Sequence, residues 1–146
     1  MPSKKHSVIV KAPLEKVWDF VRSMDNWAPL VPGYIQHQII SDLVSTWEFK
    51  TDIGFIKKKI SLRIDILKWE EPSQVSFKLT GINEKFIGSG YFSAQQVGET
   101  QTKMTGYLEI NAFGTFAPMV NSVLEPKLDE ITQELTIEVC KAIEQR

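Results

Sequence analysis

The fold is decided by the stretch 114–146, which reads GTFAPMVNSVLEPKLDEITQELTIEVCKAIEQR. Its apolar residues recur at steps of four and three, the spacing of one face of an α-helix: Val120, Leu124, Leu128, Ile131, Leu135, Val139 and Ala142. Polar residues occupy the edges and the opposite side. Pro126 removes one backbone donor, so we expect the helix to bend or break there. A helix of about 25 residues is about 37 Å long and needs a long apolar surface to lie on.

Length and charge exclude several classes of protein. The chain has 146 residues, enough for one domain spanning residues 1–146. Its 17 basic and 18 acidic residues give a net charge of -1, which argues against nucleic acid as a partner. No stretch reaches the roughly 18 apolar residues of a membrane span. The N-terminus lacks the long apolar core of a secretory signal.

The chain has a single cysteine, Cys140, so no internal disulfide can form and a cytoplasmic location is expected. At its helical angle Cys140 falls on the polar side of the last helix. We interpret it as an ordinary free thiol rather than a nucleophile, because no histidine lies nearby in the sequence to activate it.

The beginning of the chain predicts one strand followed by two short helices. Residues 5–11 form a β-branched run that is typical of a strand. Pro13 suits the first turn of a helix over residues 13–22. Asp25 is placed to cap a second short helix, which Pro32-Gly33 ends.

From Tyr34 to Ile110 apolar residues alternate with polar ones, which predicts antiparallel strands with one dry face. The expected strands cover residues 34–41, 45–51, 60–69, 75–80, 86–96 and 104–110. Turns are expected between them at Asp52-Ile53-Gly54, Glu71-Pro72-Ser73 and Gly98-Glu99. Together with the first strand they make a seven-stranded sheet, whose apolar face must be buried against the helix stripe.

A sheet of seven strands twists and curls, so we expect an α+β fold in which a curved sheet surrounds the C-terminal helix. Gly88, Gly90 and Gly106 fall on the inward face of this sheet. They either leave room for an internal cavity or only relieve crowding where the sheet meets the helix. Small-molecule sites are usually apolar concavities of this kind.

The stretch VKAPLEKVWDFVRSMDNWAPLVPGY, residues 10–34, resembles the opening of the START-like (SRPBCC) superfamily. Within it the chain resembles the CoxG proteins of carbon monoxide dehydrogenase. The shared motifs are Pro32-Gly33 after the second helix, the G-x-x-K-K turn of Gly54 to Lys58, and Leu79-Thr80-Gly81 followed by Gly88-Ser89-Gly90. The start of the last helix departs from that family, where it is rich in glycine and glutamine. The resemblance implies the helix-grip fold, a seven-stranded antiparallel sheet around a C-terminal helix with a hydrophobic cavity between them.

Inward residues in mid-strand and at the start of the last helix would line such a cavity: Trp47, Phe49, Phe77, Phe92, Leu108, Asn121 and Leu124. The resemblance adds Trp27 and Tyr34, which flank the second short helix at the cavity mouth. For each aromatic residue, simple core packing is an equally good interpretation. Asn121 falls about 50° from the centre of the stripe. A hydrogen bond to the sheet is favoured for its amide over a contact with a ligand.

No other constellation of residues indicates chemistry. His6 and His37 are the only histidines, and no His/Cys/Asp/Glu cluster has metal-ligand spacing. We therefore expect no metal, no cofactor and no catalytic residue with a recognisable signature. Lys57-Lys58-Lys59 is interpreted as a solvated turn, with a weak membrane-surface contact as the alternative.

Three functions stay open at this point. The leading one is non-catalytic binding of a small hydrophobic ligand, such as a lipid, a quinone or a polyketide-like ring, to which the resemblance adds an accessory role beside a molybdenum hydroxylase. The second is a polyketide cyclase or dehydratase, for which Glu84, His37 and Lys50 are the candidate acids and bases. The third is a protein-interaction module with a filled core. An open apolar cavity favours the first, converging carboxylate or imidazole groups the second, and a packed interior the third.

Overall fold

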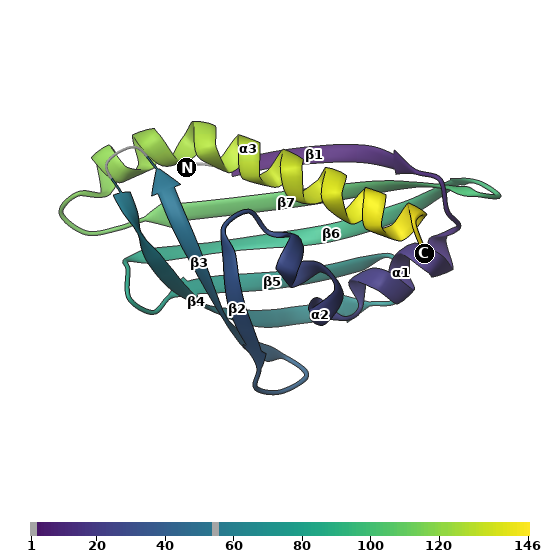
Figure 1. Cartoon of the computed structure of the whole chain (residues 1–146), viewed down its shortest axis with the longest axis horizontal. Helices are drawn as coiled ribbons and strands as arrows, with labels where there is room; N and C mark the ends of the chain where they lie inside the picture. Colours follow the sequence, from purple (N-terminus) through teal and green to yellow (C-terminus); the bar gives the residue numbers. More distant parts are fainter. Residues whose placement is uncertain (1–2, 54–55) are drawn as a thin grey trace.

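In residues 3–53 and 56–146, which a computed structural model describes, seven antiparallel strands form one curved sheet and a long helix lies across it (Figure 1). Side chains are described outside residues 51–58. The strands are β1 (Ser3–Val10), β2 (Tyr34–Ile39), β3 (Val44–Ile53), β4 (Ile56–Glu70), β5 (Gln74–Gly81), β6 (Phe86–Gly98) and β7 (Gln101–Ala112). The helices are α1 (Leu14–Val21), α2 (Met24–Trp27), the 3-10 helix η1 (Ala28–Leu30) and α3 (Ala117–Glu144). The helix-grip fold predicted from the sequence is confirmed.

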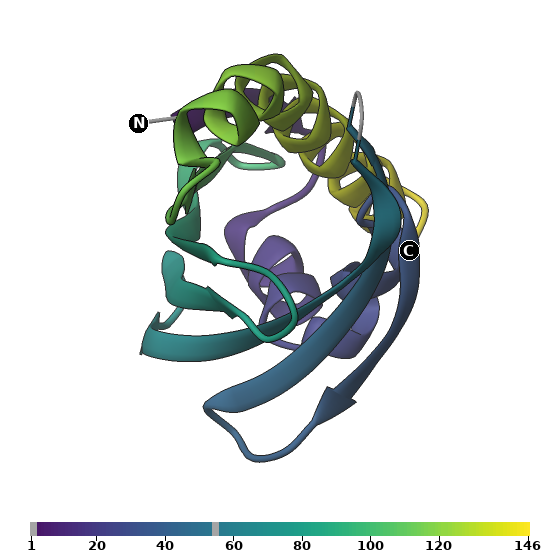
Figure 2. The same ribbon diagram turned by 90° about the vertical axis from the view of Figure 1, so that its left-hand side faces the viewer.

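The strands follow the order β1-β7-β6-β5-β4-β3-β2, so that β1 and β2 form the two edges of the sheet. Figure 2 shows how the sheet curls, with α3 closing over its open side and the short helices at the far end. Irregularities of register in three strand pairs, between Tyr34 and Gln36, Ile66 and Lys68, and Gln96 and Gly98, add local twist to this curl. A turn was predicted at Asp52-Ile53-Gly54, but Asp52 and Ile53 still belong to β3, because they pair with residues of β4. Gly54 lies outside the described part of the chain.

The second short helix starts differently from the prediction. The residue before α2 is Ser23, whose side chain makes no capping hydrogen bond, and Asp25 lies inside the first turn. The prediction that Asp25 caps this helix is therefore wrong. Its carboxylate instead lies 2.7 Å from Nε2 of His37 on β2.

The last helix was predicted to bend or break at Pro126, but it does not break there, because α3 runs continuously through this residue. A proline inside a helix leaves the carbonyl group four residues earlier without its donor. Here that residue is Ser122, and both Ser122 and Pro126 are exposed. Water can hydrate the carbonyl group of Ser122, so the helix tolerates the missing hydrogen bond.

The buried face of α3 is rotated relative to the predicted stripe. Its buried residues are Leu124, Leu128, Thr132, Thr136, Val139 and Ile143. The two threonines were not expected there because their hydroxyl groups are polar. Each hydroxyl donates to the carbonyl four residues earlier, at 2.8 Å for Thr132 and 2.7 Å for Thr136, so burial leaves neither unsatisfied.

The solid part of the core lies under the C-terminal half of α3 and beneath the two short helices. It is built from large side chains of six elements: Val10, Trp18, Trp27, Phe92, Met104, Val139 and Ile143. The N-terminal half of α3 covers a different part of the sheet, where a space remains between one edge of the helix and the inward side chains. That difference along one helix creates the candidate site.

Candidate functional site

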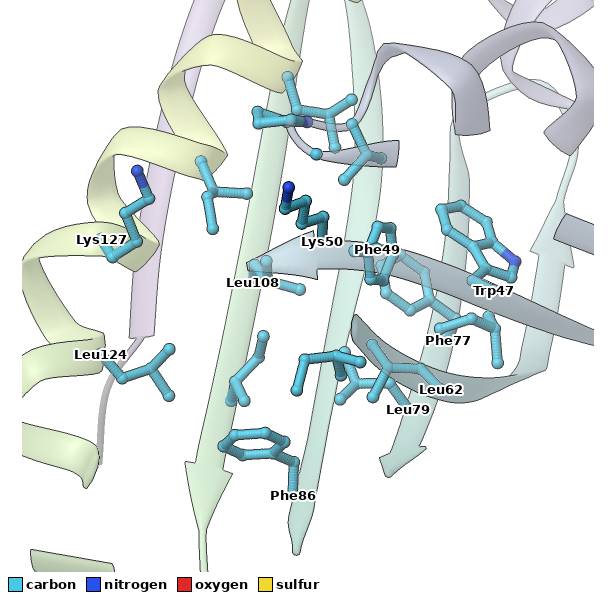
Figure 3. A pocket seen from close by; sticks show the side chains of 18 of the residues that line it. Trp47, Phe49, Lys50, Leu62, Phe77, Leu79, Phe86, Leu108, Leu124 and Lys127 are labelled. Carbon is cyan, nitrogen blue, oxygen red and sulfur yellow. The ribbon is translucent and has the colours of Figure 1, made fainter. Parts of the chain in front are cut away.

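A cavity of about 260 Å³ lies between the N-terminal half of α3 and the inner face of the sheet (Figure 3). Strands β3 to β7 supply most of its wall, α3 supplies one side, and the segment after η1 supplies part of the edge. Its size is close to the lower end of the roughly 300–1,000 Å³ that is usual for small-molecule sites. The space can hold a ring system or a short acyl chain.

An aromatic cluster closes one end of the cavity. The ring of Trp27, on α2, lies 5.3 Å from that of Trp47 and 6.4 Å from that of Phe77. Trp47 lies 5.9 Å from Phe49, the next inward residue on β3. The indole of Trp27 donates to the carbonyl of Val21 and that of Trp47 to Ser45, so no buried N–H of these two indoles is left for a ligand. This end of the cavity is apolar, and its two indole N–H groups are already satisfied by the protein.

The structure brings six of the nine predicted ligand-binding residues together in the wall of this cavity: Trp27, Trp47, Phe49, Phe77, Leu108 and Leu124. Figure 3 shows Trp47, Phe49 and Phe77 on the sheet side, with Leu124 facing them from α3. Phe92, Asn121 and Tyr34 do not line it. Whether the six residues bind a ligand stays a prediction.

The three remaining residues make contacts elsewhere in the protein. Phe92 packs in the solid core, with its ring 5.1 Å from that of Trp27. The amide of Asn121 bonds to both backbone groups of Ala112 at the end of β7, accepting at 2.8 Å and donating at 3.2 Å. This is the structural role favoured for Asn121. Tyr34 binds His37 through its hydroxyl group.

Sequence reasoning missed much of the helix side of the cavity. Leu124, Lys127, Ile131 and Leu135 line it together, at steps of three and four along α3. The signal was present, because this spacing describes one edge of the predicted stripe. It could not be recognised, because a lysine interrupts the apolar pattern. In addition, periodicity does not distinguish a helix edge that faces a cavity from an edge that faces packed side chains.

The inward glycines relieve crowding rather than border the cavity. A Cβ atom on Gly90 would lie 2.6 Å from the ring of Phe77, and one on Gly106 would lie 2.6 Å from the hydroxyl oxygen of Thr136. On Gly88 it would meet the carbonyl oxygen of Glu109. None of the three is in the cavity wall as the described residues define it. Of the two interpretations made from the sequence, the structure supports the second.

The Pro32-Gly33 motif has a clear physical role at the edge of the cavity. Gly33 has φ +81°, a conformation that favours glycine. Its carbonyl accepts a hydrogen bond of 2.7 Å from the amide of Lys50, and a Cβ atom on Gly33 would clash with the Lys50 carbonyl oxygen. Glycine therefore lets the segment after η1 lie directly against β3, which brings Pro32, Gly33 and Lys50 into the cavity wall.

Of the three candidate acids and bases, Lys50 alone lies in the described cavity wall. His37 does not line it; its Nε2 lies 2.7 Å from a carboxylate oxygen of Asp25, and its Nδ1 lies 2.6 Å from the hydroxyl oxygen of Tyr34. Glu84 lies in the connection between β5 and β6, outside that wall. The described side chains therefore bring no carboxylate or imidazole into the cavity. Among them no cluster of His, Cys, Asp and Glu is placed to hold a metal ion.

Cys140 is partly buried against β1 instead of facing solvent, which corrects the expectation that it lies on the polar side of the helix. Its sulfur lies 3.9 Å from the carbonyl oxygen of Ile9 and 3.7 Å from a carboxylate oxygen of Glu144. Burial, with the nearby Glu144 charge, raises the pKa of the thiol to about 11. Such a thiol is protonated at neutral pH, which agrees with its interpretation as an unreactive group.

The basic run Lys57-Lys58-Lys59 lies mostly outside the described side chains, which include only Lys59. The ammonium group of Lys59 lies 3.7 Å from Glu48. The backbone of all three lysines belongs to β4, so the prediction that they form a turn is wrong. Whether the side chains of Lys57 and Lys58 are solvated or contact a membrane surface is untested. No helix in the described part of the chain is long and apolar enough to cross a membrane.

A curved sheet that grips a helix over an apolar cavity defines the START-like, helix-grip class of proteins. The model of the carbon monoxide dehydrogenase CoxG family matches residues 7–144, so the chain belongs to the CoxG family. The resemblance seen in the sequence is confirmed. A comparison with curated proteins found no match.

Solved structures with the same fold cover almost the whole chain. A conserved protein from Geobacillus kaustophilus has a TM-score of 0.83 and 14% identity over 98% of this chain and 95% of its own. The Zhui aromatase/cyclase from Streptomyces sp. R1128 has a TM-score of 0.78 and 14% identity, over 99% and 94%. A START superfamily protein from Mycobacterium smegmatis has a TM-score of 0.68 and 16% identity, over 95% and 97%. At these identities the likeness concerns the fold alone.

Proposed function

We propose that this protein binds a small hydrophobic molecule in the cavity under α3 without transforming it. The observation that carries the proposal is the wall of the cavity, in which all described residues except two lysines are apolar. Apolar contact supplies affinity at roughly 25 cal/mol per Å² before the costs of association are subtracted. A lipid, a quinone or a polyketide-like ring fits such a wall.

The same wall supports the binding function over the two alternatives. A cyclase or dehydratase needs an acid or base held against its substrate, and His37 and Glu84 lie outside the described wall. An interaction module would have filled this space with side chains, as the region around Phe92 and Met104 is filled. Membership of the CoxG family adds an accessory role beside carbon monoxide dehydrogenase, a molybdenum hydroxylase, to the proposal.

The test is a titration with N-phenyl-1-naphthylamine, a neutral dye whose fluorescence rises in apolar surroundings, followed by displacement with lipids and quinones. Leu108→Trp should weaken dye binding by about tenfold or more, because Leu108 is half-buried in the wall and a larger ring enters the space. Tyr107→Trp is the matched control. Tyr107 is the preceding residue on β7, and its ring stacks on Tyr91 on the other face of the sheet.

Wild type should bind the dye saturably and release it to lipids or quinones, and Tyr107→Trp should bind like wild type. Thermal unfolding of each variant verifies that it is folded. The proposal is overturned if folded wild type binds no dye, or if Leu108→Trp binds it as well as wild type does. In either case the interaction-module function takes its place.

A further inference from the structure

The charged side chains in the described part of the cavity wall are all of one sign. The described wall includes two charged residues, Lys50 from β3 and Lys127 from α3, and no acidic residue. Figure 3 shows both lysines in the same part of the cavity, away from the end where Phe86 and Leu79 lie. A wall made only for hydrocarbon would gain nothing from two positive charges, because a charge is costly to place beside apolar surface.

Lys127 occupies a position that the helix pattern would give to an apolar residue. It lies between Leu124 and Ile131 on the edge of α3 that faces the cavity, and its side chain is 34% exposed. A lysine in such a place lines apolar surface with its methylene chain and keeps its ammonium group at the solvent. The charge of Lys127 is therefore at the opening, where the cavity meets water.

The existing partner of Lys127 leaves it available for a ligand. Its ammonium group lies 3.3 Å from Glu130, one turn further along the same helix, and the Glu130 side chain is 56% exposed. Exposed pairs of this kind contribute little stability and exchange readily with other partners. An anion placed at the opening competes with Glu130 at small cost.

Lys50 is fixed by its backbone and open at its side chain. Its amide donates to the carbonyl of Gly33, which locks this point of β3 against the segment after η1. The side chain is exposed, and in the part of the chain that the structure describes no carboxylate pairs with it. The backbone position is thus set by a neighbouring segment, while no anion among the described side chains competes for the ammonium group.

We propose that the ligand of this cavity has an apolar body and one anionic group, a carboxylate or a phosphate monoester, bound at the opening by Lys50 and Lys127. The inference rests on the proposed function, because it assumes that the apolar body occupies the cavity. It narrows the ligand from any hydrophobic molecule to an amphipathic acid. Neutral molecules of the same shape bind through apolar contact alone.

The experiment measures displacement of N-phenyl-1-naphthylamine by decanoate, decyl phosphate and decanol, each below its aggregation concentration. With wild type at low ionic strength, at least one of the two anions should displace the dye at about tenfold lower concentration than decanol does. The stronger of the two identifies the anionic group. The advantage should shrink in 1 M salt, where the Debye length falls to about 3 Å.

Lys50→Met and Lys127→Met keep the length and apolar character of the side chains and remove their charges. The quantity compared is the ratio between the concentrations of decanol and of the anion that displace the dye. Each single variant should lower this ratio about threefold or more, and the double variant should bring it close to one. The concentration of decanol that displaces the dye should stay as in wild type. Lys141→Met is the matched control. Lys141 is also on α3 with a glutamate 3.4 Å away, Glu138, but it lies outside the cavity wall. It should leave all three affinities unchanged.

The inference is overturned if decanol competes as well as both anions, or if the double variant keeps the full advantage of the anion. Either result would mean that the lysines only cover apolar surface, and the binding function would still stand. If none of the three compounds displaces the dye, the inference fails. Absence of dye binding by wild type would remove the proposed function as well, so the two failures are distinguishable.

Discussion

Gly106 on β7 lies directly beneath Thr136 on α3, so closely that a Cβ atom on Gly106 would be 2.6 Å from the threonine hydroxyl oxygen. The hydroxyl group is itself held by a 2.7 Å hydrogen bond to the carbonyl of Thr132, and Thr136 is 1% exposed. Neither partner can move without disturbing the core. This contact sets how near the helix approaches the sheet in its C-terminal half.

Gly106→Ala should therefore lower the free energy of unfolding by about 1–3 kcal/mol, the usual cost of overpacking a core. Chemical denaturation measures the change. Gly98→Ala is the control, because a Cβ atom there would meet only Gln101 at 3.7 Å, an ordinary contact. In a double-mutant cycle Thr136→Ala should return part of the loss, with a coupling of about 0.5 kcal/mol or more. Equal stability of Gly106→Ala and Gly98→Ala would contradict this close contact.

Leu128→Asp should destabilise the protein by about 4 kcal/mol or more, because Leu128 is 0% exposed and an unpaired carboxylate would be buried against the sheet. Leu128→Ala, which adds no charge, should cost about 2–5 kcal/mol. Gln133→Asp, at an exposed position on the same helix, should change stability by about 0.5 kcal/mol or less. A thermal midpoint of Leu128→Asp within error of wild type would mean that this face of α3 is not packed as described.

Asn121→Ala should lower stability by about 1–3 kcal/mol, because the variant leaves both backbone groups of Ala112 without their partner. Dye affinity should change by less than about twofold, since the amide is not part of the cavity wall. Ser122→Ala, at the exposed next position, is the control. A large loss of dye affinity in a variant of normal stability would restore Asn121 to the set of ligand contacts.

His37→Ala should lower stability by about 1–2 kcal/mol, because His37 joins Asp25 of α2 to Tyr34 of β2 through two hydrogen bonds. The neighbouring Gln38 is exposed, and Gln38→Ala should leave the thermal midpoint unchanged. If His37 were a catalytic base, its removal would lower the rate of a reaction on the bound molecule and leave stability unchanged. Normal stability combined with loss of an activity on a bound ring would favour the cyclase alternative.

Cys140 should react slowly with iodoacetamide in the folded protein near pH 8 and faster as the pH approaches 11, because burial raises the pKa of the thiol to about 11. The same protein unfolded in urea serves as the reference and should react readily at pH 8. The sign for stability follows from proton binding. Above the unfolded pKa of about 8.5, the unfolded chain loses this proton while the folded chain keeps it. The contribution of the Cys140 thiol to the free energy of unfolding therefore falls as the pH rises towards 11. Fast labelling of the folded protein at pH 8 would show that the thiol is more exposed than the structure has it.

Most of the fold could be predicted from local patterns. Period-two alternation placed Trp47 and Phe49 on the inner face of β3, and in the structure they pair with Leu62 and Ile60 on the inner face of β4. Boundaries were less accurate, since β4 begins at Ile56 rather than at Ile60. Pairing with a neighbouring strand extends an antiparallel strand beyond the residues whose own pattern favours it.

The candidate site was predicted less completely than the fold. Phe77 and Phe92 have the same pattern, each an inward aromatic residue in mid-strand, yet one lines the cavity and the other is packed in the solid core. Both rings lie near that of Trp27, which is 6.4 Å from Phe77 and 5.1 Å from Phe92, so the way this one side chain packs helps to decide which space is filled. No local pattern shows where a side chain from a helix so distant in the sequence will lie.

The sequence by itself determined which side chains point inward, because side-chain direction follows from a period of two in strands and 3.6 in helices. It also determined that one long helix must cover one sheet face. Only the tertiary structure decided where that face is packed and where it is hollow. The spacing between α3 and the sheet depends on contacts between distant residues, among them Thr136 on Gly106 at one end and Asn121 on Ala112 at the other. The presence of both Lys50 and Lys127 in the wall of one cavity likewise depends on how β3 and α3 meet in space, which neither stretch encodes alone.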